Sequence, residues 1–278
     1  MAESRTLGEQ YPKTHDPCVL YHHPELNEDA QRYAPWCQLV SAPAAPTVSR
    51  PALFFDYRGM WLCMPGYSTA FQPSDGDIQR RVRSRTPTDL VRACGMNLDG
   101  KRVLDACAGF GSDGLLLAQM GAHVSLIERH RLVWIMLEER AKHLSNAETL
   151  CADASSHLLG DGAKQEDPWD VILLDPMFPL TNKRALPNRG LQHLRELTES
   201  SQTDHDDLLS LLARSKQHCR GRVVLKRRLK DSVLERPDFQ IKAKSVRFDV
   251  YKGLARPQNY VLQRLSFSSS PATTLSSA

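Results

Sequence analysis

The segment Val103–Gly111, V-L-D-A-C-A-G-F-G, is the feature that most constrains the fold of this 278-residue chain. Two aliphatic residues lead into Asp105, small residues follow, and Gly109 and Gly111 are separated by one residue. The apolar run Leu115–Ala118 then begins a helix. A buried strand that ends in a glycine-lined turn and leads into a helix is typical of nucleotide-type sites, because backbone amides there can approach a polar ligand. We therefore predict such a site here.

Strand and helix patterns alternate regularly from Gly100 onward. Successive βα units of this length imply a parallel sheet with right-handed crossovers, so we predict an α/β, Rossmann-like, doubly wound, mostly parallel seven-stranded sheet. The predicted strands are Arg102–Ala106, Ala122–Ile127, Thr149–Ala152, Asp170–Leu174 and Arg222–Lys226, with more within Phe239–Tyr251 and Tyr260–Leu265; the predicted helices are Ser112–Met120, Arg131–Leu144 and Leu208–His218, the last after a polar stretch, Thr181–Asp207.

The N-terminal part has a different character. Residues 1 to about 50 are rich in proline and lack a sustained period, so we predict a small, irregular α+β appendage followed by a linker. Ala52–Tyr57 and Met60–Met64, joined by Arg58-Gly59, predict a β-hairpin, and Thr86–Asp89 predicts the cap of a helix ending near Cys94. We place the domains at 1–95 (appendage, hairpin and basic segment), 96–265 (catalytic domain) and 266–278 (a disordered Ser-rich tail).

Composition excludes several protein classes. The seven cysteines contain no C-x-x-C pair, which argues against a disulfide framework or a zinc site and favours reduced, buried thiols. No signal-peptide pattern follows Met1, and no run approaches the roughly 18 apolar residues that span a membrane. We expect a soluble, cytoplasmic, monomeric protein without a metal. Its net charge of +4 only mildly favours acidic partners.

The spacing D-x-x-x-G-x-G differs from the G-x-G-x-x-G of dinucleotide sites. Ser112 and Asp113 occupy the start of the helix, where a carboxylate would repel a pyrophosphate. Asp105 and Asp113 suit a ligand with an amine or a positive charge, and S-adenosylmethionine (SAM) carries both. An ordinary strand–turn–helix without a ligand would show the same local pattern.

Acidic and hydroxyl side chains end the next two predicted strands. Glu128 lies 19 residues beyond Gly109, where a carboxylate can accept both hydroxyls of a ribose, a group that NAD and SAM share. Asp153-Ala154-Ser155-Ser156 closes the third strand, where its donors could reach an adenine edge. Plain helix capping would produce the same residues.

The most specific motif is Asp175-Pro176-Met177-Phe178-Pro179, directly after the buried run Val171–Leu174. It resembles the D/N-P-P-Y/F motif of methyltransferases that modify exocyclic amines of bases, with Met177 in place of the second proline. Such an amine is a poor nucleophile, and Asp175 with the Pro176 carbonyl can accept its N–H groups and orient it. Phe178 can stack on the base. Alternatively, the segment is a turn with Phe178 in the core.

Two basic clusters could bind RNA phosphates. A solvated surface would explain either cluster alone, but together they favour nucleic acid over a small-molecule substrate. Their members are Arg80, Arg81, Arg83 and Arg85, and Lys226, Arg227, Arg228 and Lys230.

Taken together, these motifs resemble the bacterial small-subunit ribosomal RNA guanine-N2 methyltransferases of the J type. The resemblance covers Phe71 to Gly253 and adds L-I-E-R (Leu126–Arg129), V-V-L-K-R (Val223–Arg227) and R-F-D-V-Y-K-G (Arg247–Gly253). It implies a class I methyltransferase fold, SAM as cofactor, and 16S ribosomal RNA in the small ribosomal subunit as partner. The cofactor contacts that it implies are Ser112, Asp113, Glu128, Arg129, Ser155, Ser156 and Asp175. The glycine turn adds Asp105 and Gly109 as predicted cofactor contacts, and the Asp175 motif gives Asp175 and Phe178 as the predicted catalytic residues.

We therefore predict a SAM-dependent methyltransferase that methylates the N2 amine of a guanosine in 16S ribosomal RNA. One alternative is a methyltransferase for another amine, adenine N6 or a protein glutamine. Another is a ribosome-assembly factor that binds RNA without catalysis, although Asp105, Glu128 and Asp175 argue against it. An NAD-dependent oxidoreductase is disfavoured by the missing third glycine and by Asp113.

Overall fold

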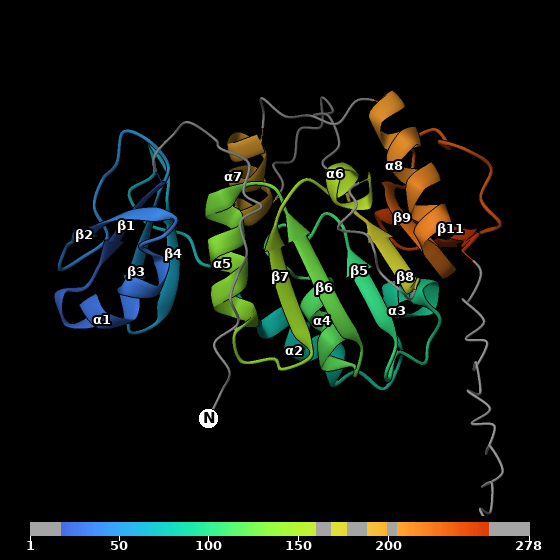
Figure 1. Cartoon of the computed structure of the whole chain (residues 1–278), viewed down its shortest axis with the longest axis horizontal. Helices are drawn as coiled ribbons and strands as arrows, with labels where there is room; N and C mark the ends of the chain where they lie inside the picture. Colours follow the sequence, from blue (N-terminus) through green and yellow to red (C-terminus); the bar gives the residue numbers. More distant parts are fainter. Residues whose placement is uncertain (1–17, 160–167, 177–187, 199–204, 256–278) are drawn as a thin grey trace, which may run out of the picture.

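The computed structural model describes residues 18–159, 168–176, 188–198 and 205–255, and these residues form two β-sheets (Figure 1). The larger sheet has the strand order β10-β11-β9-β8-β5-β6-β7, and its five strands from β9 to β7 are parallel to one another. Strand β11 pairs antiparallel with β9, and β10 pairs antiparallel with β11. The predicted α/β, mostly parallel seven-stranded sheet is thus confirmed. Its strands are β5 (Arg102–Asp105), β6 (His123–Glu128), β7 (Ala147–Cys151), β8 (Trp169–Leu174), β9 (Cys219–Arg228), β10 (Phe239–Lys242) and β11 (Val246–Lys252).

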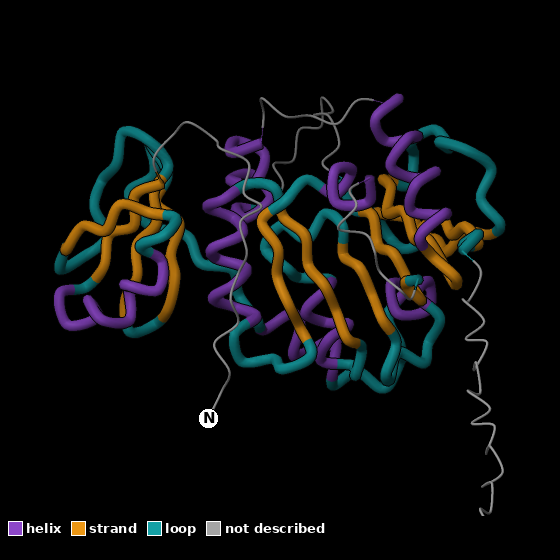
Figure 2. The backbone as a smooth tube through the Cα atoms, in the orientation of Figure 1, coloured by secondary structure: helices purple, strands orange, loops and turns teal. Residues whose placement is uncertain are grey.

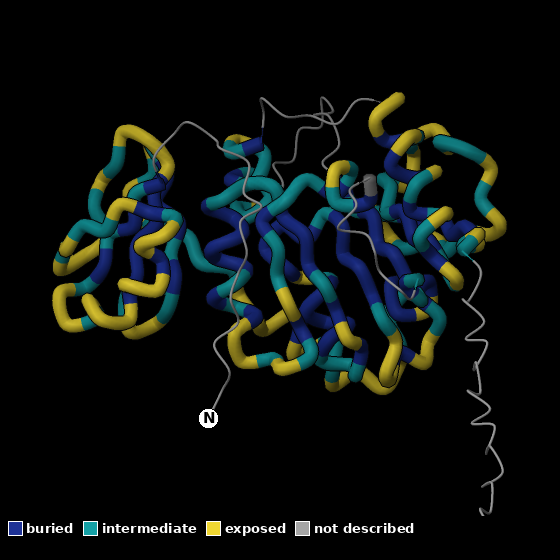
Figure 3. The backbone as a smooth tube through the Cα atoms, viewed as in Figure 1, coloured by how far each residue is buried: buried dark blue, intermediate teal, exposed yellow. Residues whose placement is uncertain are grey.

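Helices cover both faces of this sheet (Figure 2). Neighbouring residues of one strand point to opposite faces, so Val103 packs with α2, α3, α4 and α5 while Leu104 packs with α6 and α8. Because both faces are covered, the inner strands β5, β6 and β8 are buried along most of their length (Figure 3). The helices are α2 (Gly76–Val82), α3 (Asp89–Cys94), α4 (Gly114–Gln119), α5 (Arg131–Ala141), α6 (Ala154–Leu159), α7 (Arg189–Thr198) and α8 (His205–His218).

The predicted helix ending at Cys94 is confirmed as α3. The Thr88 hydroxyl accepts a hydrogen bond from the Val91 amide (3.4 Å), and Gly95 ends the helix with a φ of +115°. Ile78 of α2 and Leu90 of α3 belong to the core of the larger sheet, so these helices pack with it although they precede residue 96. The predicted strand Tyr260–Leu265 and the predicted tail 266–278 lie outside the described residues.

The N-terminal segment is more regular than predicted. Its smaller sheet has the order β2-β1-β3-β4, with β1 (Cys18–His22) parallel to β2 (Cys37–Ser41) and to β3 (Ala52–Asp56). The irregular structure predicted up to residue 50 is therefore wrong for β1, β2 and the short helices between them, η1 (Pro24–Leu26), α1 (Asn27–Ala30) and η2 (Gln31–Tyr33). The hairpin of β3 and β4 (Gly59–Cys63) is confirmed.

Two cysteines also depart from the prediction. Cys18 and Cys37 face each other in the register of β1 and β2, with their Cα atoms 4.6 Å apart, and form a disulfide. The expectation of reduced thiols is wrong for this pair, because parallel strand pairing joins two cysteines that no sequence motif connects. The other five cysteines are free thiols.

Helix α5 joins the two sheets. One side, including Leu137, packs on the larger sheet, and the other, including Trp134 and Met136, packs on the core of the smaller sheet. This explains why the helix is apolar nearly all round its circumference. Figure 1 shows the smaller sheet beside α5, away from the middle of the larger sheet. In the described part of the chain, no helix combines the length and apolar character needed to cross a membrane.

Candidate functional site

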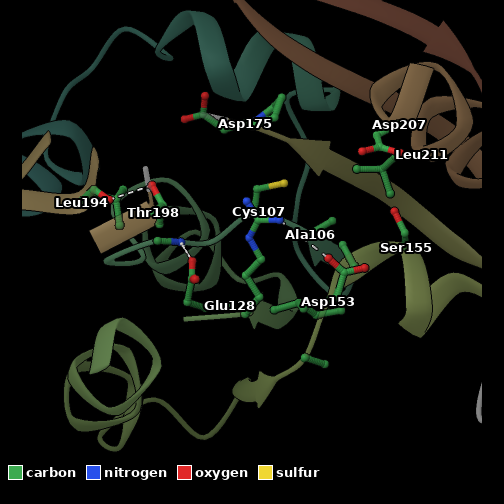
Figure 4. Close-up of a pocket in the computed structure, with 16 residues that line it drawn as sticks. Ala106, Cys107, Glu128, Asp153, Ser155, Asp175, Leu194, Thr198, Asp207 and Leu211 are labelled. Atoms are coloured by element: carbon green, nitrogen blue, oxygen red, sulfur yellow. Dashed lines mark hydrogen bonds and ion pairs between the residues drawn. The ribbon is translucent and has the colours of Figure 1, made fainter. Parts of the chain in front are cut away.

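A cavity of about 300 Å³ opens at the carboxyl ends of β5, β6 and β8, the edge at which α6 begins (Figures 1 and 4). The carboxyl ends of parallel strands are where open α/β sheets bind ligands, because the connecting loops diverge there. Among the predicted site residues, the cavity is lined by Gly109, Glu128, Arg129, Ser155 and Asp175. Its volume is in the range of small-molecule sites.

The glycine turn forms one wall of this cavity. Gly109 and Gly111 have φ angles of +53° and +80°, a backbone conformation that other residues rarely adopt. A Cβ atom at Gly111 would also overlap the Leu137 side chain of α5. At the start of α4, a Cβ atom at Gly114 would lie 2.7 Å from the Asp105 carboxylate. The turn therefore requires glycine for its backbone conformation and for close packing.

Glu128 ends β6 with a buried carboxylate. One oxygen accepts the backbone amide of Gly109 (3.0 Å) and the other accepts the amide of His130 (2.7 Å). Burial raises the pKa of Glu128, and these two amide donors oppose that effect. A carboxylate has about four acceptor positions, so Glu128 keeps capacity for a hydroxyl donor.

The Asp153–Ser156 segment caps a helix and also contributes residues to the cavity lining. Asp153 caps α6 by accepting the Ser156 amide at 3.1 Å, and it lies 4.0 Å from the Arg129 guanidinium. Asp153 and Ser155 also line the cavity, whereas Ser156 is exposed outside it. Capping and ligand binding are therefore compatible here.

Three carboxylates meet beside the cavity, and one lysine joins two of them. Lys226, near the end of β9, donates to Asp113 Oδ2 (2.7 Å) and to Asp175 Oδ2 (2.6 Å), and Arg81 of α2 donates to Asp113 Oδ1 (3.0 Å). Burial acts to raise the pKa of Asp113, but Lys226 and Arg81 hold it below its usual range. Burial and the neighbouring charges of Asp113 and Asp175 raise the pKa of Asp105 to about 8.

Several predicted residues take other positions. Asp105, Ser112 and Asp113 lie outside the lining of the cavity within the described part of the chain; Ser112 is exposed, and Asp113 is engaged by the two cations. Phe178, with Met177 and Pro179 of the same motif, lies outside the described residues. Pro176 lines the cavity next to Asp175.

The structure adds lining residues that the sequence did not single out. Cys107 lies in the glycine segment itself, Thr198 and Leu194 come from α7, and Asp207 comes from the first turn of α8. Figure 4 shows that Glu128, Asp153, Asp175 and Asp207 reach the cavity from four different elements. The leucines at positions 191, 194 and 197 recur at helical spacing, a signal that could have revealed α7 within the polar stretch.

Helix α7 is fixed over the cavity by contacts with the segment before α2. Its His193 is buried against the rings of Tyr67 and Phe71, at centroid distances of 4.5 and 5.3 Å. Arg189 donates to the backbone carbonyl of Thr69 (2.6 Å). These contacts place Leu194 and Thr198 at the cavity.

The two basic clusters are only partly available to a partner. Arg81 and Lys226 are engaged with Asp113, and Arg228 pairs with Asp231 at 2.8 Å. The exposed members are Arg80, Arg83, Arg85 and Lys230. An anionic partner would therefore meet the exposed members first, while Arg81 and Lys226 neutralise acidic groups within the protein.

Comparison with known proteins gives a consistent result. A family model of SAM-dependent methyltransferases matches residues 70–253. Ribosomal RNA small subunit methyltransferase J of Legionella pneumophila (strain Lens) is 33% identical over 241 residues, covering 84% of this chain and 95% of that protein. The protein of the same name from Acinetobacter baylyi is 34% identical over 223 residues, covering 72% and 80%.

A solved structure supports the fold. The SAM-dependent methyltransferase from Neisseria gonorrhoeae matches with a TM-score of 0.66 and 21% identity, covering 86% of this chain and 97% of the solved chain. At this identity the match concerns the arrangement of the strands and helices.

Proposed function

Because the chain belongs to the ribosomal RNA small subunit methyltransferase J family of SAM-dependent methyltransferases, we propose that it methylates the exocyclic N2 amine of a guanosine in 16S ribosomal RNA. The observation that carries this proposal is the position of Asp175. It follows β8 directly, lines the cavity together with Pro176, and belongs to a motif suited to exocyclic amines.

The described residues fit SAM, which supplies an activated methyl group on a sulfonium. Four carboxylates line the cavity, those of Glu128, Asp153, Asp175 and Asp207, against the single guanidinium of Arg129 among the described lining residues. This excess of negative charge suits a cationic ligand and disfavours a pyrophosphate. The buried Glu128 would hold the ribose hydroxyls, and Asp153 and Ser155 would face the adenine.

We assign the remaining predicted cofactor residues by their positions. Gly109 and Arg129 line the cavity and would contact the cofactor directly. Ser112 and Ser156 are exposed and do not line the cavity, so they would contact only a ligand that extends out of it. Asp113 would act through the charge it places behind the glycine turn, whereas Asp105, whose pKa is raised to about 8, would be mostly protonated near pH 7.

Asp175 would orient the guanine amine. The nitrogen lone pair of an exocyclic amine is delocalised into the ring, so the amine attacks only when its N–H groups are held and the lone pair is directed. An ionised carboxylate accepts one N–H and the Pro176 carbonyl can accept the other. Asp175 need not be a strong base, because methylation acidifies the amine and its proton can leave afterwards. We propose that Phe178 stacks on the guanine.

The test is methyl transfer to 30S subunits that lack the modification, with product mapping by mass spectrometry. The wild-type protein should produce N2-methylguanosine in 16S ribosomal RNA, and Asp175→Ala should lower turnover about 10²-fold or more, in line with the loss of a positioned catalytic group. Methyl groups on adenine N6 or on a protein glutamine would identify the alternative substrates. Absence of SAM binding by calorimetry would favour the non-catalytic assembly factor, and wild-type turnover by Asp175→Ala would contradict the assigned role.

A further inference from the structure

Lys226 of β9 lies beside Asp175, the residue that directly follows β8. β8 and β9 pair up to Leu174 and Leu225, so Asp175 and Lys226 are the next residues on neighbouring strands. The Lys226 ammonium lies 2.6 Å from Asp175 Oδ2 and 2.7 Å from Asp113 Oδ2. Its side chain is only 23% exposed, and it lies outside the cavity lining. The ion pairs are therefore partly shielded from water and fixed in direction.

The ammonium is held from the other side as well. Asp113, at the start of α4, receives Lys226 on one oxygen and Arg81 on the other. Arg81 comes from α2, so charges from four elements alternate in sign along the series Arg81, Asp113, Lys226, Asp175. With both its oxygens engaged, Asp113 anchors the lysine.

The anchored lysine makes the two carboxylate oxygens of Asp175 different in their capacity to accept a hydrogen bond from a substrate. Oδ2 is occupied by Lys226, whereas the described residues give Oδ1 no hydrogen-bond partner. Asp175 itself lines the cavity. Oδ1 thus has both its acceptor positions open among the described residues, whereas one position of Oδ2 is taken by Lys226.

The lysine also offsets the acidic groups that face Asp175. These groups are Asp113 at the start of α4, Asp105 at the end of β5 and the Cys107 thiol in the glycine segment, with Arg81 behind Asp113. Burial raises the pKa of Asp175, Lys226 lowers it, and Asp113 raises it further. For Lys226, burial acts to lower the pKa, but Asp175 and Asp113 raise it above its usual range. The lysine remains charged, and without it the carboxylates of Asp113 and Asp175 would face each other beside the buried Asp105 carboxyl group.

We propose that Lys226 is a positioning residue that, anchored by Asp113, holds Oδ2 of the Asp175 carboxylate and so directs Oδ1 toward the substrate amine. The inference rests on the proposed function of Asp175. It gives Asp113 a structural task at the active carboxylate in addition to any electrostatic effect on the cofactor.

The experiment compares Lys226→Met with the charge-conserving Lys226→Arg and with Lys252→Met. Lys252 is an exposed lysine at the opposite end of the neighbouring strand β11, so it serves as the matched control. In methyl transfer to 30S subunits, Lys226→Met should lose tenfold or more in kcat at about pH 7, with recovery near pH 9, since one pKa unit is roughly a tenfold change in ionisation. SAM affinity should change less than about threefold because Lys226 does not line the cavity.

The direction of the pH effect follows from the charge removed. Asp175 must be ionised, so activity falls as the pH drops through its pKa, and loss of Lys226 raises that pKa and moves the acid limb to higher pH. Lys226→Arg should keep the acid limb of the pH–activity profile at the wild-type pH. A loss of kcat that is equal at every pH, or a parallel loss of SAM affinity, would overturn the proposal.

A second measurement is independent of the substrate. A ¹³C-NMR titration of aspartate carboxyls, assigned with Asp175→Asn and without RNA or SAM, should show a higher Asp175 pKa in Lys226→Met than in the wild type. If Lys226→Met does not fold, the double variant Lys226→Met/Asp113→Asn should fold, because it also removes the repelling charge, and should still lack the lysine's fixed orientation of Asp175. An Asp175 pKa that is the same in Lys226→Met and in the wild type would overturn the role of Lys226. If that pKa is shifted but the wild-type protein transfers no methyl group to 30S subunits, only the proposed substrate is contradicted.

Discussion

The backbone amide of Gly109 donates a 3.0 Å hydrogen bond to the Glu128 carboxylate, which links the glycine turn after β5 to the end of β6. The same carboxylate accepts the His130 amide at the start of α5. Glu128 therefore stabilises the shape of the turn in addition to facing the cavity. A residue with both tasks should affect binding and stability together.

Glu128→Gln should weaken SAM binding about tenfold or more and lower the free energy of unfolding by about 1–3 kcal/mol. The amide replaces one acceptor oxygen by an NH₂ group, which leaves a buried backbone amide without its acceptor and removes the charge-assisted bonds to the ribose. Calorimetric titration with SAM and thermal denaturation measure the two effects. Glu148→Gln, an exposed acid on the adjacent strand β7, is the control and should change neither. Unchanged SAM affinity in Glu128→Gln would contradict the ribose assignment.

Asp105→Asn should flatten the pH dependence of stability. The pKa of Asp105 is raised from 3.8 to about 8 by burial and by Asp113 and Asp175, so the folded chain binds more protons than the unfolded chain between these values. Stability from this group is complete below about pH 4 and is lost as the pH rises toward about 8, with a magnitude on the order of a few kcal/mol. Denaturant titrations of the protein without SAM at several pH values check this. Asp29→Asn, an exposed aspartate of α1, should keep the wild-type slope, and an identical slope in Asp105→Asn would refute the buried proton.

Gly111→Ala and Gly66→Ala form a matched pair. Their φ angles are +80° and +78°, so alanine meets the same backbone strain at both positions, about 1–2 kcal/mol. Only at Gly111 would the new Cβ atom overlap Leu137 and press on Leu115; at Gly66 no atom lies within 4 Å. Crowding should add about 1–3 kcal/mol at Gly111, measured by denaturant unfolding. Equal losses at the two positions would show that α5 moves aside without cost.

Much of the fold and part of the site follow from local sequence patterns. Each βα unit is local, and parallel strands bring their carboxyl ends to one edge, so Gly109, Glu128, Ser155 and Asp175 could be predicted to meet without knowledge of strand order. The predicted strand ends were accurate there because buried parallel strands are short apolar runs bounded by polar turns.

The charge pairs could not be predicted in the same way. Lys226 and Asp113 are 113 positions apart, and their contact depends on the strand order β9-β8-β5. The contact of Arg81 with Asp113 depends on the packing of α2 against α4. From the sequence, Lys226 belongs to a basic cluster that could bind phosphate, and only the structure shows that it pairs with Asp113 and Asp175. The pairing of β1 with β2, and with it the Cys18–Cys37 disulfide, is likewise a tertiary contact between short strands that have no turn signal joining them.

The pairing of β8 with β9 has a consequence for how this enzyme can change over time. Asp175 and Lys226 are neighbours across two strands, yet 51 positions separate them along the chain, including α7 and α8. The charge pair follows from the sheet register and from the Asp113 contact, so the chain between the two residues can change in length while Asp175 and Lys226 stay paired. Changes of length between the two residues can therefore accumulate without separating the pair, whereas the residues of this segment that line the cavity, Leu194, Thr198 and Asp207, stay constrained by it.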